Sequence, residues 1–257
     1  MLAALIWDVD GTFAETERDG HRIAFNEAFE ALGLAWRWDV PRYAELLRVT
    51  GGRERLLHDM ASQPDAPADA AERSALAAAL HAEKNRRYAL IAASGRIPLR
   101  PGVARLLREA TAAGLQHAIA TTTSRVNLDA LMRQHFGAVW PSLFAAVVCA
   151  EDAPVKKPDP QVYRMALDRL SLDPEEALAI EDSPNGLAAA SAAGIATLVT
   201  RSLNFAGQPF EDALAVCDDL DSPAAPSSRL LGARSARVDV AQLGVWHGAW
   251  WRERLAA

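Results

Sequence analysis

Short apolar runs that end in polar residues recur along the chain and predict buried strands. The first run is Leu5-Ile6-Trp7, and its strand is expected to stop at Asp8-Val9-Asp10-Gly11-Thr12 because Asp and Gly are poor strand formers. Similar runs cover residues 116–121, 144–149, 177–180 and 195–199, and segments with apolar residues at helical spacing separate them. Strands that alternate with helices predict an α/β fold, in which helices cover both faces of a parallel sheet.

The stretch between residues 16 and 94 has no strand pattern and is typical of helices. Apolar positions recur at helical spacing over 21–32, Pro41 favours the start of a second helix, and further helices are predicted over 55–61 and 69–93. We therefore expect a core domain of residues 1–14 and 97–221, interrupted by a helical domain of residues 15–96. Residues 222–257, which contain Trp246, Trp250 and Trp251, are expected to form an extension packed on the core.

Composition and charge narrow the class of protein. Half of the 257 residues are hydrophobic, and the net charge of -6 gives no support for nucleic-acid binding. The chain reaches Asp8 too early for a signal peptide, and no apolar run is long enough to cross a bilayer. Only two cysteines occur, so a scaffold built on disulfides is not expected. The six histidines lack the spacing of zinc ligands. We expect a cytoplasmic protein that binds small molecules and neither nucleic acid nor membrane.

Asp8 and Asp10 form the first candidate site. Residues i and i+2 of an extended chain share a side, so the two carboxylates are expected to face a common region. Such a pair suits a divalent cation, or a nucleophile beside an acid/base. A solvated acidic turn is the alternative, and this segment alone leaves it open.

Polar groups also follow three other predicted strands. Thr122 follows the second strand, Lys157 lies beyond the third, and Glu181-Asp182 ends the fourth. A parallel sheet brings these ends to one edge, where ligands bind in open α/β sheets. Each group alone has a simpler reading as a cap, a surface charge or an acidic loop. Their ordered appearance favours a site for phosphate and magnesium.

These segments resemble the four motifs of the haloacid dehalogenase superfamily of phosphatases. The matching segments, in order, are Asp8-Val9-Asp10-Gly11-Thr12, Thr122, Lys157-Pro158-Asp159-Pro160 and Glu181-Asp182-Ser183-Pro184-Asn185-Gly186. The chain is similar to the CbbY-like branch of the subgroup that contains β-phosphoglucomutase. The resemblance implies a Rossmann-like core, and it places an α-helical cap where the helical domain is predicted.

The resemblance also implies roles for the motif residues. Asp8 is expected to attack phosphorus and form an aspartyl phosphate, while Asp10 protonates the leaving group and then deprotonates water. Mg²⁺ is expected to be held by the Asp8 carboxylate, the Asp182 carboxylate and the main-chain carbonyl of Asp10. Glu181 is expected either to bind the ion or to contact the residues that bind it. Thr122 and Lys157 are expected to neutralise the phosphoryl oxygens.

The substrate implied by the resemblance is xylulose 1,5-bisphosphate, which would give xylulose 5-phosphate in a reaction associated with the Calvin cycle. A monomer is expected. The residues expected to bind the substrate are Glu17, His21, Gly51, Gly52, Arg53, Lys84, Thr123 and Ser124, with Arg55 and Arg87 as further candidates for the second phosphate. A β-phosphoglucomutase, a phosphoglycolate phosphatase and a non-catalytic phosphate-binding scaffold stay open as alternatives. Thr12 favours the phosphatase over the mutase, and intact Asp8 and Asp10 argue against the scaffold.

Overall fold

The computed structural model describes residues 1–228 and 233–256, which form two compact units. The first unit contains residues 1–15, 99–122 and 138–257, and the second contains residues 16–98 and 123–137. Residues 123–137 thus group with the helical unit, although chain order alone placed them in the core. Within the described ranges, no helix combines the length and apolar character needed to cross a membrane.

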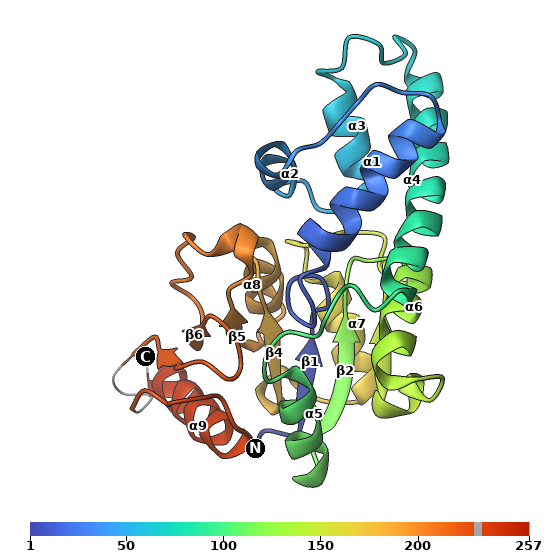
Figure 1. Cartoon of the computed structure of the whole chain (residues 1–257). Helices are drawn as coiled ribbons and strands as arrows, with labels where there is room; N and C mark the ends of the chain where they lie inside the picture. Colours follow the sequence, from blue (N-terminus) through green and yellow to red (C-terminus); the bar gives the residue numbers. More distant parts are fainter. Residues whose placement is uncertain (229–232, 257) are drawn as a thin grey trace. The chain divides into compact units, whose positions relative to one another are not determined.

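The first unit is built on a sheet whose described strands run in the order β3-β2-β1-β4-β5-β6-β7. Figure 1 labels the central part of this order, from β2 to β6. All neighbouring strands are parallel except the antiparallel pair β6 and β7. The strands are β1 (Ala4–Trp7), β2 (Gln116–Ala120), β3 (Ala146–Val148), β4 (Ala177–Glu181), β5 (Ala196–Thr200), β6 (Ala215–Cys217) and β7 (Ala225–Pro226). The predicted α/β fold with a parallel sheet is confirmed, and β6 and β7 are additions to the five predicted strands.

The central strand β1 is buried on both sides, which explains its continuous apolar sequence. Ala4 and Ile6 lie in the core cluster that also contains residues of α7 (Gln161–Leu170) and α8 (Pro184–Ala192). On the opposite face, the Trp7 indole donates a hydrogen bond of 3.1 Å to Nδ1 of His117. The register sets Trp7 between Ile119 of β2 and Ile180 of β4, so Asp8 emerges level with the ends of both neighbours.

Helix α5 (Val103–Ala112) packs against β2 and α9 (Val240–Ala256). Its apolar face is buried, as the spacing of Val103, Leu106 and Leu107 predicts. In α9, Leu243 and Trp246 are fully buried. Short helical turns complete the unit: η2 (Trp140–Leu143), η3 (Pro174–Glu176) and η4 (Leu203–Phe205).

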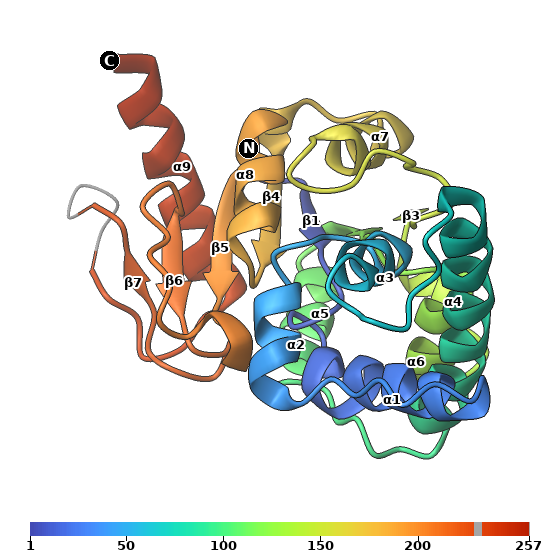
Figure 2. The same cartoon turned by 90° about the horizontal axis from the view of Figure 1, so that it is seen from above.

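The second unit is helical throughout its regular structure. Its elements are η1 (Glu17–His21), α1 (Arg22–Ala31), α2 (Val40–Leu46), α3 (Gly52–Met60), α4 (Ala70–Ala93) and α6 (Arg125–Phe136). The long helix α4 packs against α1, α3 and α6 (Figure 2). The carboxylates of Asp39 and Asp69 cap α2 and α4 by accepting backbone N–H bonds. Helix α3 begins at Gly52, three residues before the predicted start.

Candidate active site

Three buried carboxylates meet at the carboxyl ends of β1 and β4. Asp8 follows β1, Glu181 ends β4, and Asp182 is the next residue. One oxygen from each lies within 4.8 Å of the others, and the three side chains are almost fully buried. Carboxylate oxygens are hard ligands of the kind that Mg²⁺ prefers. This donor set fits a divalent cation of that class.

Lys157 is the cation that contacts this cluster. Its Nζ lies 2.7 Å from Oδ1 of Asp8 and 2.7 Å from Oε1 of Glu181, and it donates a third bond of 3.0 Å to the Ala120 carbonyl. The lysine is itself buried. One ammonium therefore pairs with two of the three carboxylates, Asp8 and Glu181, and the cluster keeps an excess of negative charge.

The excess charge shifts the protonation of the cluster. Burial, followed by the charge of Glu181, raises the pKa of Asp8 to about 7, and burial followed by the charge of Asp8 raises the pKa of Asp182 well above its usual range. Burial alone would lower the pKa of Lys157, but Asp8 and Glu181 outweigh it and the pKa is raised. A bound divalent cation would offset the repulsion and favour the ionised carboxylates.

Two glycines allow the chain to approach these carboxylates. A Cβ atom at Gly11, whose φ is +89°, would lie 2.1 Å from Oδ2 of Asp182. A Cβ atom at Gly186 would lie 2.0 Å from the carboxylate of Glu181. The glycines of the first and fourth motifs are therefore required by close approach.

Of the other predicted residues in this unit, Asp10 is half-buried, and its charge contributes to the raised pKa of Asp8. Thr122 is half-buried just after β2. The Thr12 hydroxyl donates a bond of 3.1 Å to Oδ2 of Asp8. The turn after β1 thus supplies both a carboxylate and the hydroxyl that orients it.

Tyr163 on α7 is a member of the cluster that the sequence did not indicate. Its hydroxyl donates a bond of 2.6 Å to Oε1 of Glu181, and its ring lies 4.9 Å from Nζ of Lys157. Burial and the charge of Glu181 raise its pKa well above the ordinary value. Tyr163 therefore stays a hydrogen-bond donor that fixes Glu181.

The helical unit contains its own buried polar group around Glu17. The hydroxyl of Tyr43 donates a short hydrogen bond to Oε2 of Glu17 and accepts one of 2.8 Å from Nη1 of Arg55. The Arg55 guanidinium lies 3.7 Å from Glu17 and is almost fully buried. A carboxylate, a phenol and a guanidinium together can bind hydroxyl and phosphate groups.

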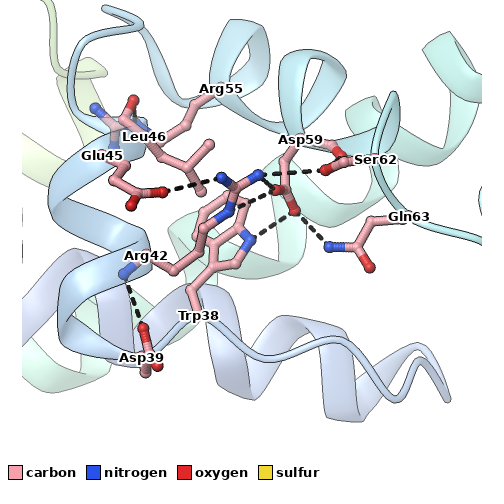
Figure 3. A network of polar contacts seen from close by, with 9 residues as sticks. All are labelled: Trp38, Asp39, Arg42, Glu45, Leu46, Arg55, Asp59, Ser62 and Gln63. Carbon is pink, nitrogen blue, oxygen red and sulfur yellow. Dashed lines mark hydrogen bonds and ion pairs between the residues drawn. The ribbon is translucent and has the colours of Figure 1, made fainter.

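A second network in this unit centres on Asp59 of α3 (Figure 3). Its carboxylate lies 2.5 Å from Nη2 of Arg42 and accepts bonds of 2.7 Å from the Trp38 indole and 2.8 Å from Gln63. Arg42 precedes Tyr43 on α2, while Asp59 lies one helical turn beyond Arg55 on α3. The Asp59 network therefore ties together the two helices that carry Tyr43 and Arg55.

The remaining predicted substrate residues occupy varied surroundings in the helical unit. The His21 ring stacks on Tyr88 at 4.0 Å, and the buried Lys84 ammonium lies 5.1 Å from the Phe25 ring. Arg53 is exposed and bonds to Ser74 at 2.7 Å. Gly51 (φ +97°) and Gly52 stand at the start of α3, and Thr123 and Ser124 stand just before α6. Arg87 lies 2.6 Å from Glu83.

Comparison with known proteins identifies the family. A family model described as haloacid dehalogenase-like hydrolase matches residues 2–194. The plasmid form of CbbY from Cupriavidus necator is 48% identical over 247 residues, which span 96% of this chain and 97% of that protein. A CBBY-like protein from Arabidopsis thaliana is 39% identical over 227 residues, or 86% of this chain and 70% of that protein.

A solved structure supports the same relationship. The crystal structure of a CbbY variant from Rhodobacter sphaeroides in complex with xylulose-(1,5)bisphosphate has a TM-score of 0.80 and 42% identity, and it covers 85% of this chain and 95% of that chain. The resemblance to the CbbY-like branch is confirmed. The chain therefore belongs to the haloacid dehalogenase-like hydrolases and is a phosphoric monoester hydrolase that acts on a small-molecule substrate.

Proposed function

We propose that the chain hydrolyses a sugar bisphosphate through a covalent phosphoryl group on Asp8, with Mg²⁺ as cofactor. The observation that carries this proposal is the buried cluster of Asp8, Lys157, Glu181 and Asp182 at the carboxyl edge of the sheet. A carboxylate held beside an ammonium and a cation site can act as a nucleophile toward an anionic phosphate.

Asp8, Glu181 and Asp182, with the main-chain carbonyl of Asp10, would hold the magnesium ion. When bound, the ion would neutralise charge on the phosphoryl oxygens and allow an anionic carboxylate to approach them. Lys157 would supply a second positive charge, and the Thr122 hydroxyl would donate to a phosphoryl oxygen. Tyr163 would hold Glu181 in place through its hydroxyl.

The chemistry divides into two steps. In the first, an Asp8 oxygen bonds to phosphorus, the bond from phosphorus to the sugar oxygen breaks, and Asp10 donates a proton to that oxygen. In the second, Asp10 takes a proton from water as the water oxygen bonds to phosphorus. Cleavage of the bond to Asp8 then releases inorganic phosphate and regenerates the carboxylate.

Xylulose 1,5-bisphosphate is the proposed substrate, with xylulose 5-phosphate and phosphate as products in a reaction associated with the Calvin cycle. The complex of the Rhodobacter sphaeroides CbbY variant with this bisphosphate supports the assignment. The group of Glu17, Tyr43 and Arg55 also supports it, because a half-buried carboxylate and a buried guanidinium suit sugar hydroxyls and a second phosphate. The other predicted residues of the helical unit, together with Thr123 and Ser124, remain candidates for the rest of the sugar.

The test is phosphate release from a substrate panel with and without Mg²⁺. The panel contains xylulose 1,5-bisphosphate, xylulose 5-phosphate, β-glucose 1-phosphate and phosphoglycolate. The bisphosphate is expected to be preferred about tenfold or more in kcat/KM, because a charge-assisted contact to the second phosphate is worth about 1.5–3 kcal/mol. Chelation with EDTA and the Asp8→Asn substitution should each abolish turnover.

Three results would redirect the assignment. Conversion of β-glucose 1-phosphate to glucose 6-phosphate would indicate a mutase, and preference for phosphoglycolate would indicate the other phosphatase. Binding of phosphate without turnover of any substrate would indicate a scaffold. Loss of bisphosphate preference in Arg55→Ala or in Arg53→Ala would assign the second phosphate to that arginine.

A further inference from the structure

Arg100 is a buried arginine of the first unit that no motif contains. Its guanidinium donates hydrogen bonds to backbone carbonyls from separate parts of the chain, and the side chain is 8% exposed. Its carbonyl partners are Gly11, Thr200 at 2.9 Å, Arg201 at 2.6 Å and Asp218. Its Nε lies 3.4 Å from Oε1 of Glu15. One side chain thus joins the turn after β1 to the segments at the carboxyl ends of β5 and β6.

The same residue also holds that turn through its backbone. The N–H of Arg100 donates a bond of 2.7 Å to the Phe13 carbonyl, and Leu99 forms an antiparallel bridge with Ala14. Gly11 and Phe13 are therefore both anchored by Arg100, one by its side chain and one by its backbone. Arg100 therefore adds two anchors to a turn that is also closed by its own backbone bonds, from Gly11 N–H to the Ala14 carbonyl and from Phe13 N–H to the Val9 carbonyl.

Gly11 is the link between Arg100 and the carboxylate cluster. Its Cα packs against Asp182 so closely that an added Cβ would lie 2.1 Å from Oδ2. Displacement of Gly11 by a fraction of an ångström would alter the space left to Asp182. Lysine cannot replace the arginine here, because its ammonium is a point charge and cannot reach separated carbonyls with a planar fork of donors.

We infer that Arg100 is a positioning residue for the metal-binding carboxylates, which sets the distance between Asp8 and Asp182 through the Gly11 turn. This inference rests on the proposed function, in which those carboxylates hold a divalent cation. Groups that orient metal ligands without touching the metal typically change its affinity about 10–100-fold when removed.

The test compares Arg100→Lys with Arg105→Lys. Arg105 is a matched control in the same unit, since it also donates to two carbonyls, those of Leu220 at 2.8 Å and Val238 at 2.9 Å. It also contacts Glu109 and Asp221, and it bonds to no residue of the cluster. The readouts are the Kd for Mg²⁺ by titration calorimetry, Mn²⁺ binding by electron paramagnetic resonance, and the Tm of the metal-free protein.

Both variants are expected to have a lower Tm, and only Arg100→Lys should bind Mg²⁺ and Mn²⁺ more weakly, by about tenfold. Equal metal affinity in Arg100→Lys and the unsubstituted protein would overturn the inference, as would equal weakening in both variants. Failure of the unsubstituted protein to bind either cation would instead overturn the proposed function. If Arg100→Lys does not fold, Arg100→Gln, which keeps a planar amide with two donors but removes the charge that acts on Asp182, is compared with Arg105→Gln. Only Arg100→Gln should bind Mg²⁺ and Mn²⁺ more weakly, and equal affinity in the two variants would overturn the inference.

Discussion

The two units bury charge in opposite ways. In the helical unit, the buried Asp59 pairs with Arg42 and the half-buried Glu17 lies beside Arg55, so each of these carboxylates has a guanidinium of its own. In the sheet unit, Asp8 and Glu181 share the single ammonium of Lys157, and Asp182 lies beside them in the same cluster. A balanced network is complete within the protein, whereas an unbalanced one is stabilised by a positively charged ligand. The contrast separates a network that holds helices together from a cluster whose donor set fits a divalent cation.

Removal of the Lys157 ammonium should produce the largest effect on turnover and on stability. In Lys157→Met, turnover is expected to fall about 10²–10³-fold, because a preorganised positive charge on the phosphate is lost. The buried carboxylates of Asp8 and Glu181 would then lose their ion-pair partner, so the free energy of unfolding of the metal-free protein should fall by about 3 kcal/mol. Initial rates and urea denaturation measure the two effects.

Lys156→Met is the matched control for that substitution. The Lys156 ammonium bonds to the carbonyls of Ala150 and Ala153 and to no carboxylate of the cluster. Turnover by the Lys156→Met variant should therefore match that of the unsubstituted protein. A loss of turnover in Lys156→Met equal to that in Lys157→Met would erase the distinction between cluster and surroundings.

The pH dependence of stability should reveal the charge excess directly. The pKa of Asp8 is raised from 3.8 to about 7, so the folded state holds this proton more tightly than the unfolded state does. Stability from this group is therefore complete below pH 3.8 and is lost as the pH rises through about 7. The Tm of the metal-free protein relative to Asp8→Asn should fall across that interval, and Mg²⁺ should reverse the fall. A constant difference in Tm would contradict the raised pKa.

A substitution in the Asp59 network should lower the stability of the protein without changing its affinity for metal. In Asp59→Asn, loss of the ion pair with Arg42 and replacement of one acceptor oxygen by an NH₂ donor are expected to lower the free energy of unfolding by about 2–3 kcal/mol. The Kd for Mg²⁺ should not change. Asp39→Asn is the control, because asparagine caps a helix as well as aspartate does. Weakened Mg²⁺ binding in Asp59→Asn would break the comparison.

Substitution of a glycine that packs closely against the carboxylate cluster should give the smallest of these effects. In Gly186→Ala the new Cβ would collide with the Glu181 carboxylate, so we expect a loss of about 1–3 kcal/mol in stability and weaker Mg²⁺ binding. Gly244→Ala is a control in the second turn of α9, where nothing lies within 4 Å of an added Cβ. There the substitution should stabilise the helix by up to about 1 kcal/mol. Thermal melting and calorimetry distinguish the two.

The sequence predicted the parts that follow from strand ends. Polar residues interrupt apolar runs at Asp8 and at Glu181, and parallel pairing of β1 with β4 brings those interruptions together. Lys157 could be placed beside them because its loop also follows a strand of the sheet. Periodicity and chain order were sufficient for this part of the molecule.

The residues that were missed depend on tertiary packing. Arg100 bonds mainly to carbonyls, which every residue possesses, so its partners leave no pattern in the sequence. Tyr163 lies among apolar residues of α7 and has the appearance of an ordinary core position. Arg53 and Arg55 were both predicted as substrate-binding candidates, but spacing could not say that the rotation of α3 exposes Arg53 and buries Arg55 against Tyr43. That rotation depends on how α3 packs on α2, which spacing alone does not specify.

The outer strand β7 has a consequence for the behaviour of the protein in concentrated solution. It is two residues long and contains Pro226, which has no backbone N–H to offer a neighbouring chain. The strand at the opposite edge of the described sheet, β3, has only three residues. Edge strands that are short or contain proline are poor templates for the addition of strands from other molecules, so this sheet is protected from edge-to-edge aggregation.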